Sequence, residues 1–205
     1  MTLLPSRPLA TDATLVARVA TGDADAFGEL YRRRRGDVYR FALHMTGSRA
    51  AAEDVAQDAF LTVMRNAARY DASRATAVAW LCGIARNCVR QRRDRERPFQ
   101  PLATLAGGTG AEPAAQSDPL GALELAEEID RLRQMVLSLP VRYREAVVLC
   151  DLQELSYADA AAAMGCGVGT VRSRLYRGRE LLAAKLGAER RRAGAAIARD
   201  AGCTT

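Results

Sequence analysis

Arginines recur at regular spacing in two segments of the chain, and the spacing suits binding to a polyanion. In GCGVGTVRSRLYRGREL, residues 165–181, they stand at positions 172, 174, 177 and 179, directly after three glycines. A second set shares one face of a helix, because its members are separated by four, three and four residues: Arg86, Arg90, Arg93 and Arg97. A guanidinium group neutralises a phosphate or contacts two acceptors of a guanine, so both segments indicate nucleic-acid binding.

Catalytic chemistry has few candidate residues. The single histidine, His44, lies in an apolar helical pattern where a core hydrogen bond is its usual role, and the five cysteines form no CxxC pair. This spacing fits neither a zinc site nor a disulfide framework. We therefore predict no catalytic residue, no metal and no cofactor. A redox role for Cys82, Cys88 or Cys166 stays open.

A further cluster is acidic and lies on adjacent turns of one predicted helix. It consists of Glu53, Asp54, Gln57 and Asp58. Two carboxylates could serve a metal or acid–base chemistry, but no third ligand, histidine or glycine-rich phosphate loop is near them. An acidic patch in an otherwise basic segment favours the docking of a basic protein partner.

The charge of the chain is segregated along its 205 residues, although the net charge is only +6. Residues 1–97 carry 17 basic side chains against 11 acidic ones, residues 98–164 carry 4 against 10, and residues 165–205 carry 9 against 3. Two basic segments around an acidic one favour a partner such as nucleic acid or an anionic membrane surface. No apolar run reaches the roughly 18 residues of a membrane span, and no secretory signal is recognisable, so we expect a cytoplasmic protein without membrane insertion.

Helical periodicity runs through most of the chain and strand signals are nearly missing, so the predicted fold class is all-α. In the first part, residues 12–97, four helices are expected, the last after the polar loop of residues 70–73. The expected caps at helix starts are Asp12, then Asp23 or Asp25, then Ser48.

Residues 98–119 differ in composition from both flanking parts. They hold four of the seven prolines and the run GGTG, and they lack an apolar period. Such a segment predicts a flexible linker between two small helical domains, of which the second covers residues 120–187. Residues 188–205 are basic with weak periodicity, which predicts a disordered tail.

The second predicted domain contains a helix-turn-helix pattern. A short helix is expected over Tyr157 to Met164, starting after a Ser156 cap and stopping at Gly165, with the next helix starting near Val168 to Thr170. The predicted outward residues of that helix are Arg172, Ser173, Tyr176 and Arg177, and the predicted inward ones are Val171 and Leu175. This geometry places a recognition helix in the major groove of DNA.

Two stretches, in this order, resemble conserved regions of bacterial RNA polymerase sigma factors. AEDVAQDAFLTVMRNAARYD followed by AWLCGIARNCVRQRRDR resembles region 2, and LPVRYREAVVLCDLQELSYADAAAAMGCGVGTVRSRLYRGRELL resembles region 4. Two such regions with a short linker between them resemble the small extracytoplasmic-function (ECF) group. The resemblance covers roughly residues 12–187, and the two motifs together are more specific than either alone.

The resemblance implies three partners, namely core RNA polymerase, promoter DNA and an anti-sigma factor. The polymerase-binding residues that it implies are Glu53, Asp54, Gln57, Asp58 and Phe60. For the minus-ten element, with a flipped base held beside the loop of residues 70–76, they are Tyr70, Arg86, Asn87, Arg90 and Arg93. For the minus-thirty-five element they are Thr170, Arg172, Ser173, Tyr176 and Arg177.

The sequence also departs from the family pattern. Ala160 and Ala163 stand where larger apolar residues are usual, which predicts weaker packing of the first helix of the motif, and Gly167 replaces a proline or a capping serine. The alternative function is a helix-turn-helix regulator that binds duplex DNA without polymerase. The acidic surface around residues 54–60 discriminates between the two, because such a regulator has no use for it.

Overall fold

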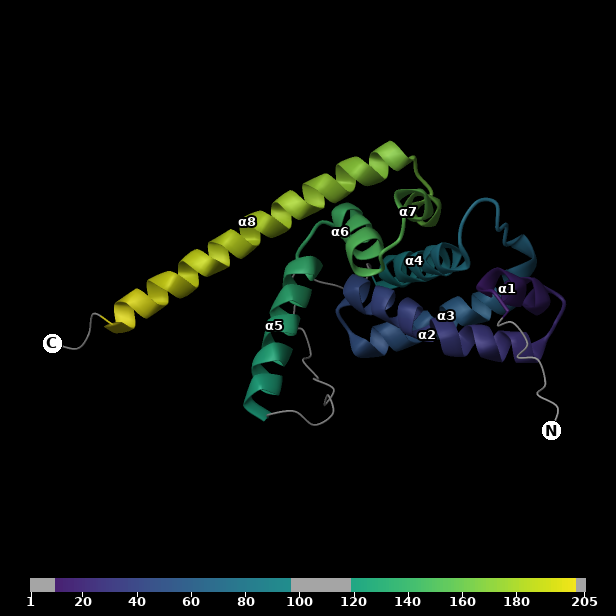
Figure 1. Cartoon of the computed structure of the whole chain (residues 1–205), viewed down its shortest axis with the longest axis horizontal. Coiled ribbons are helices and arrows are strands. Elements are labelled where there is room, and N and C mark those ends of the chain that lie inside the picture. The colour runs from purple at the N-terminus through teal and green to yellow at the C-terminus, as the bar shows by residue number, and fades with distance from the viewer. Residues whose placement is uncertain (1–9, 97–118, 202–205) are drawn as a thin grey trace, which may run out of the picture.

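The computed structural model describes residues 10–96 and 119–201, with side chains for all of these except residues 119–126, 190 and 192–201. Every regular element within these ranges is a helix, which confirms the predicted all-α class (Figure 1). None of these helices is long and apolar enough to cross a membrane. The predicted linker lies outside the described residues apart from Pro119.

The first unit is built from four helices and a short 3-10 turn. These are α1 (Asp12–Ala20), α2 (Ala24–Thr46), α3 (Arg49–Asn66), the turn η1 (Ala67–Arg69) and α4 (Ala77–Glu96). Their apolar faces meet in a core to which each helix contributes a fully or nearly fully buried side chain, among them Leu15, Leu30, Val55 and Leu81. The core fixes the directions in which the polar faces of α3 and α4 point.

Two of the helix caps predicted for the first unit are confirmed, as is the Ser156 cap of the second unit, whose hydroxyl accepts the N–H of Asp159 at 3.0 Å. Asp23 accepts the backbone N–H of Ala26 at 2.9 Å at the start of α2, and Ser48 accepts that of Ala51 at 3.3 Å at the start of α3. Gly47 between α2 and α3 adopts a left-handed conformation with φ 75°, which closes α2 and which a residue with a Cβ would adopt only with strain.

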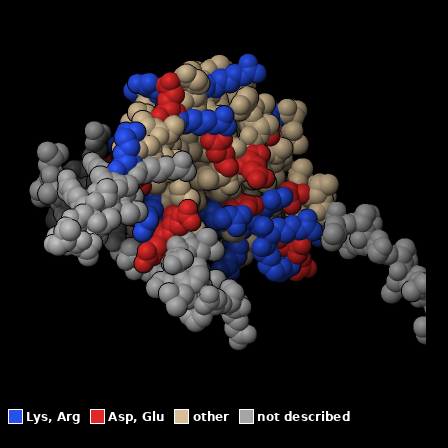
Figure 2. Space-filling view, turned by 60° about the vertical axis from the view of Figure 1, so that its left-hand side comes forward, with Lys and Arg blue, Asp and Glu red and all other residues tan. Residues whose placement is uncertain are grey.

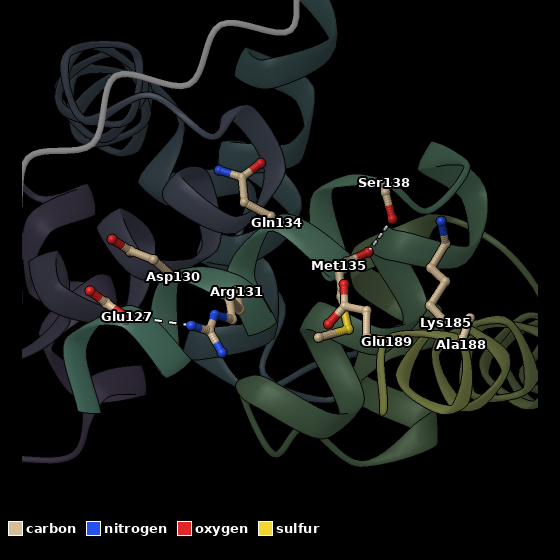
Figure 3. A pocket seen from close by; sticks show the side chains of 9 residues that line it. All are labelled: Glu127, Asp130, Arg131, Gln134, Met135, Ser138, Lys185, Ala188 and Glu189. Carbon is tan, nitrogen blue, oxygen red and sulfur yellow. Dashed lines mark hydrogen bonds and ion pairs between the residues drawn. The ribbon is translucent and has the colours of Figure 1, made fainter. Parts of the chain in front are cut away.

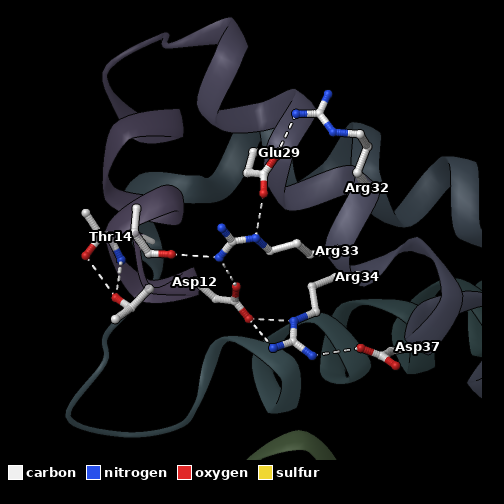
Figure 4. Close-up of polar contacts among 9 residues, drawn as sticks. Asp12, Thr14, Glu29, Arg32, Arg33, Arg34 and Asp37 are labelled. Carbon is white, nitrogen blue, oxygen red and sulfur yellow. Dashed lines mark hydrogen bonds and ion pairs between the residues drawn. The ribbon is translucent and has the colours of Figure 1, made fainter. Parts of the chain in front are cut away.

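The cap of α1 differs from the prediction. Thr11, rather than Asp12, accepts the N–H of Thr14 at 3.2 Å. Asp12 lies one residue inside the helix, and its carboxylate instead forms ion pairs with Arg34 and, at 3.5 Å, with Arg33 of α2 (Figure 4). The sequence did not show this, because the two arginines are more than 20 positions away.

The second unit contains the helix-turn-helix. Its elements are α5 (Pro119–Leu137), α6 (Val141–Val147), the π-helical segment η3 (Val148–Leu152), α7 (Tyr157–Met164) and α8 (Val168–Ala201). The predicted bounds of α7 and the predicted start of α8 are confirmed, as is the inward direction of Val171 and Leu175, which are 0% and 2% exposed. The π-helical segment was not predicted.

Helix α8 runs further than the sequence suggested. We expected residues 188–205 to form a disordered tail, but the described backbone is helical up to Ala201. The segment AERRRAGAAIARDA consists mainly of strong helix formers, which favours continuation of the helix. In Figure 1 this part of α8 extends away from the rest of the molecule.

A glycine allows α8 to cross closely over α6. A Cβ added to Gly178 would lie 2.7 Å from Cγ2 of Val147 and 3.3 Å from the carbonyl oxygen of Tyr143. Only a residue without a side chain fits this crossing without a shift of the helices. The crossing sets the direction in which the start of α8 points.

The two units contact each other. The Arg144 guanidinium of α6 donates to the carbonyl oxygen of Met45 in α2 at 2.8 Å, and also to the carbonyls of Leu137 and Leu139 within its own unit. Burial and the nearby charge of Arg93 lower the pKa of Arg144, but three carbonyl acceptors stabilise its charged form. Helix α7 packs along α4 (Figure 1).

Candidate nucleic-acid and protein-binding surfaces

The helix-turn-helix presents its predicted outward residues together on the first three turns of α8. Gly165, with φ 64°, closes α7, and α8 begins three residues later. Tyr176 is 67% exposed. Arg172, Ser173 and Arg177 are also exposed, and Thr170 is half-buried.

The arginines of this surface are held in different ways. Arg172 lies over the ring of Tyr157, with its guanidinium carbon 5.6 Å from the ring centroid, and keeps its donors exposed. Arg177 pairs with Glu180 at 2.7 Å, which raises the pKa of Arg177. Arg179 donates twice to Asp151 of η3, at 2.6 and 3.1 Å. Arg172 is therefore the arginine with most freedom to contact a ligand, and Arg179 the one most firmly held.

The basic face of α4 exists as predicted and is shared with the second unit. Arg86, Arg90 and Arg93 line one pocket together with Arg142 of α6 and Arg174 of α8. Asn87 is exposed beside them, and Arg97 lies outside the described residues. Figure 2 shows one face of the molecule, on which several basic side chains adjoin one another at the lower right while basic and acidic side chains alternate elsewhere.

Arg86 is not exposed in this arrangement. Its Nε lies 2.9 Å from Oε1 of Glu145 in α6, and the two side chains are 12% and 5% exposed. The contact is an ion pair without hydrogen-bond alignment, since Arg86 Nε has no partner of proper geometry among the described residues. The residue that the resemblance assigns to DNA is thus covered by a carboxylate from the other unit.

The loop of residues 70–76 is ordered by its own tyrosine. The Tyr70 hydroxyl donates to the carbonyl oxygen of Ala75 at 3.1 Å, and its ring lies 5.2 Å from that of Trp80. Partial burial raises the pKa of Tyr70. At the end of the loop, the backbone N–H and the hydroxyl of Thr76 both donate to Oδ1 of Asp159 in α7, each at 2.9 Å.

The acidic residues of α3 are exposed, but Phe60 is not. Glu53, Asp54, Gln57 and Asp58 all face solvent, and Asp54 pairs with Arg92 of α4 at 2.7 Å. Phe60 is only 3% exposed and belongs to the core, but it also lines the pocket that borders Glu53 and Gln57. Its ring packs edge-on against Tyr31 of α2, 4.9 Å away, because the aromatic side chains of α2 and α3 meet there.

An apolar groove next to the acidic residues was missed by the sequence analysis. Tyr31 and Tyr39 of α2 line it from one side, and Leu61 and Met64 of α3 line it from the other. Leu61 and Met64 are 41% and 55% exposed. The signal was present in the sequence, since Gln57, Leu61 and Met64 follow one helix face.

A second open pocket lies between α5 and α8. It is lined by Glu127, Asp130, Arg131, Gln134, Met135, Ser138, Lys185, Ala188 and Glu189 (Figure 3). Charged side chains of both signs border it, and Glu127 and Arg131 approach each other at 3.4 Å. Exposed apolar residues of α5, Ile129 and Leu132, are nearby in sequence.

Family models match both units. The model described as Sigma-70 region 2 matches residues 30–98, and the model described as Sigma-70, region 4 matches residues 129–182. These matches define the class of protein, a sigma factor of the sigma-70 type.

Relatives of known class show to which group of sigma factors the chain belongs. The ECF RNA polymerase sigma factor SigW of Bacillus subtilis is 33% identical over 180 residues, which cover 83% of this chain and 94% of SigW. SigM of Mycobacterium tuberculosis H37Rv, also an ECF sigma factor, is 37% identical over 181 residues, 86% of this chain and 85% of SigM. The chain belongs to the ECF RNA polymerase sigma factors.

Solved structures agree with this membership. CnrH, in a complex with the cytosolic domain of CnrY, superposes with a TM-score of 0.64 at 28% identity over 87% of this chain and 99% of CnrH. The sigma factor RpoE, in a complex with the anti-sigma factor NepR from Bartonella quintana, superposes with a TM-score of 0.65 at 25% identity over 80% of this chain and 98% of RpoE.

Proposed function

We propose that this ECF sigma factor binds core RNA polymerase, recognises the minus-ten and minus-thirty-five elements of its promoters, and contributes no catalytic group of its own. The observation that supports this most is the pairing, on one chain, of an exposed helix-turn-helix surface with the basic face of α4. The units proposed to carry these roles are residues 12–97 and 120–187. Core polymerase with and without the purified chain, transcribing a library of promoter fragments, tests the proposal, and it fails if the chain directs no specific transcript.

At the minus-thirty-five element, we assign base contacts to the exposed start of α8. Arg172 is the leading candidate because its donors are free and Tyr157 holds it in position. Arg172→Ala should weaken binding by about 1–3 kcal/mol at a preferred sequence and relax specificity there. Arg179→Ala is the matched control on the same helix, because Asp151 already holds Arg179. Equal losses in both variants would contradict the assignment.

At the minus-ten element, we assign phosphate and base contacts to Arg86, Asn87, Arg90 and Arg93 on α4. Tyr70 supports the loop of residues 70–76 by its hydrogen bond to Ala75. Tyr70→Phe keeps the ring but removes that bond, so we expect lower promoter opening with polymerase binding unchanged. Permanganate footprinting of the melted strand measures promoter opening, and co-purification with polymerase measures polymerase binding.

For polymerase docking we assign the exposed residues Glu53, Asp54, Gln57 and Asp58 together with the apolar groove beside them. Charge and apolar surface side by side suit a basic, amphipathic helix of the partner. Asp54 and Asp58 changed together to lysine should abolish co-purification with core polymerase. The same change at Glu127, on the remote helix α5, serves as the control. Undiminished binding by the double variant would exclude the docking role.

The alternative, a regulator that acts on duplex DNA without polymerase, is not favoured, because both sigma regions match. An anti-sigma factor is a further proposed partner. RpoE, to which this chain is similar, was solved in a complex with one. Co-purification of the tagged chain from its native cells, followed by mass spectrometry, should recover core polymerase subunits and a regulator that competes with them.

A further inference from the structure

We propose that the free chain inhibits itself: α6 and α7 of the second unit pack on α4 and cover Arg86 and the loop of residues 70–76, which would take minus-ten DNA, so the two units must separate before promoter binding. This inference rests on the proposed function for the identity of the ligand. The packing of α7 on α4, called here the α4–α7 contact, is an observation of the structure and does not depend on the proposed function. Two polar links, one tight helix crossing and one covered pocket support it.

The first polar link joins the loop of residues 70–76 to α7. Oδ1 of Asp159 accepts both polar hydrogens of Thr76, at 2.9 Å each, while Oδ2 accepts the Ser156 hydroxyl at 2.8 Å. Thr76 is the residue before α4, so a carboxylate of the second unit lies at the N-terminus of α4, where the helix dipole stabilises negative charge. The polar groups that end the loop are therefore occupied and cannot contact DNA.

The second polar link is the ion pair between Arg86 and Glu145. Glu145 is buried at 4% exposure, and its carboxylate needs a positive partner in that position. Arg86 supplies the charge only while α6 lies beside α4. A DNA phosphate can reach Arg86 only after Glu145 has moved away.

Small residues allow the two helices to approach closely. A Cβ added to Gly83 of α4 would lie 3.4 Å from the Cα and the carbonyl oxygen of Ala163 in α7. Ala160 and Ala163 are 0% and 7% exposed. We expected these two alanines to weaken packing inside the helix-turn-helix. The structure gives them another use, because larger side chains there would hold α7 away from α4.

The pocket beside the loop of residues 70–76 is covered from the second unit. Tyr70 and Thr76 line it from the first unit, and residues 153–156 with Asp159 line it from the second. A base that is flipped out of the DNA and bound beside this loop would meet residues 153–156. One arrangement of the two units thus blocks both the loop of residues 70–76 and Arg86.

Charge repulsion between the two units favours their separation. Arg90 and Arg93 of α4 share a pocket with Arg142 and Arg174 of the second unit, and the only carboxylates that line this pocket in the described part of the chain are Glu145 and Asp94. Repulsion between these guanidinium groups opposes closure. The contact is therefore reversible, and attraction of either unit to a polyanion or to polymerase favours the separated form.

Hydrogen exchange of the full chain measures the contact directly. The Thr76 amide is hydrogen-bonded to Asp159 only when α7 lies on α4, so we expect it to be protected in the free protein. The Trp80 amide, which donates to the Thr76 carbonyl at 3.0 Å within α4, is the internal reference and should be protected in either form. Small-angle scattering gives the radius of gyration in parallel.

Two substitutions act on the tight crossing from opposite sides, Gly83→Leu in α4 and Ala163→Leu in α7. Each should remove Thr76 protection, leave Trp80 protection unchanged and increase the radius of gyration. Ala162→Leu makes the same change at an exposed position of α7 and should have no effect. Glu145→Gln, which removes one charge without adding bulk, provides a variant that does not depend on steric exclusion if a leucine variant fails to fold.

Separated variants should bind DNA more tightly. The probe is a single-stranded oligonucleotide of about 12 nucleotides with randomised sequence. If the closed form outnumbers the open form by about ten to one, removal of the contact raises the apparent affinity about tenfold. Ala162→Leu should bind as the unaltered chain does.

The outcomes separate the two proposals. Free exchange of Thr76 in the unaltered chain, or unchanged protection and size in both leucine variants and in Glu145→Gln, would show that the contact does not hold the units together. Separation without tighter DNA binding would show that the contact does not inhibit. Absence of DNA binding and of promoter-directed transcription in every form would refute the proposed function, while exchange and scattering would still decide whether the contact exists.

Discussion

One oxygen of Asp159 accepts hydrogen bonds from both the backbone N–H and the hydroxyl of Thr76, although 83 positions separate the two residues. Burial of the Asp159 carboxyl acts to raise its pKa, but the hydrogen bonds from Thr76 and Ser156 outweigh burial and hold the pKa below the usual range. The ionised form of Asp159 is therefore stabilised by the contact between the two units.

The first prediction concerns this carboxyl. In the free chain, the pKa of Asp159, followed by carbon-13 NMR, should lie below the reference value of about 3.9. Because the pKa is lowered in the closed form, the contribution of Asp159 to closure is fully present above about pH 3.9 and is lost as the pH falls through the lowered pKa. In Gly83→Leu the pKa should rise. An identical titration in the two proteins would contradict a link through Asp159.

The second prediction uses two glycines of α8. Gly178→Ala should lower the free energy of unfolding by about 1–3 kcal/mol, because the new Cβ would meet Val147 at 2.7 Å. Gly169→Ala on the same helix has nothing within 4 Å of its Cβ and should be neutral or stabilising by up to about 1 kcal/mol. Urea unfolding measures both, and equal stability of the two variants would exclude a tight crossing at Gly178.

The third prediction concerns His44, the single histidine of the chain. Burial, followed by the charges of Arg133 and Arg40, lowers its pKa, and its Nδ1 has no hydrogen-bond partner among the described residues, unlike the satisfied core position that the sequence suggested. Since the folded form disfavours protonation, the free energy of unfolding should fall as the pH drops below about 6.5, by at most about 1.4 kcal/mol per pH unit.

His44→Gln should remove this pH dependence while the rest of the profile stays unchanged. Denaturant unfolding at several values between about pH 5 and 8 provides the measurement. If the free energy of unfolding of the variant still depends on pH in this range, groups other than His44 cause the dependence.

The fourth prediction addresses the cysteines. Burial raises the pKa of Cys82 to about 12, and it also raises the pKa of Cys88 and of Cys150. Their thiols therefore remain protonated near neutral pH and are poor nucleophiles. Iodoacetamide at about pH 8 should leave Cys82 unmodified in the folded chain and modify it in urea, as read by peptide mass spectrometry. Rapid modification in the folded chain would reopen a redox role.

Local features of this fold could be predicted from the sequence. The Asp23 and Ser48 caps, the bounds of α7 and the exposure of Arg172, Ser173, Tyr176 and Arg177 all depend on residues within a few positions of one another. Periodicity and capping chemistry act over that range, so a single sequence contains the necessary information.

Contacts between distant residues could not be predicted. Nothing near Arg86 indicates that Glu145 will cover it, and nothing near Asp12 indicates Arg34 as its partner. The resemblance assigns Phe60 to polymerase docking, and nothing near it in sequence indicates that its ring packs edge-on against Tyr31 of α2. Each of these contacts is decided by tertiary packing rather than by helix periodicity.

The length of α8 has a mechanical consequence. At about 1.5 Å per residue, its 34 residues form a rod of roughly 50 Å whose first turns carry the recognition residues. Gly178 lies about a third of the way along α8, where this helix crosses α6 closely, so a rotation of α8 would take place about this crossing. A small rotation imposed on the far end of α8 would tilt Arg172 and its neighbours relative to DNA. A molecule that binds only the last turns of α8 would then change promoter binding without contacting a side chain that reads a base.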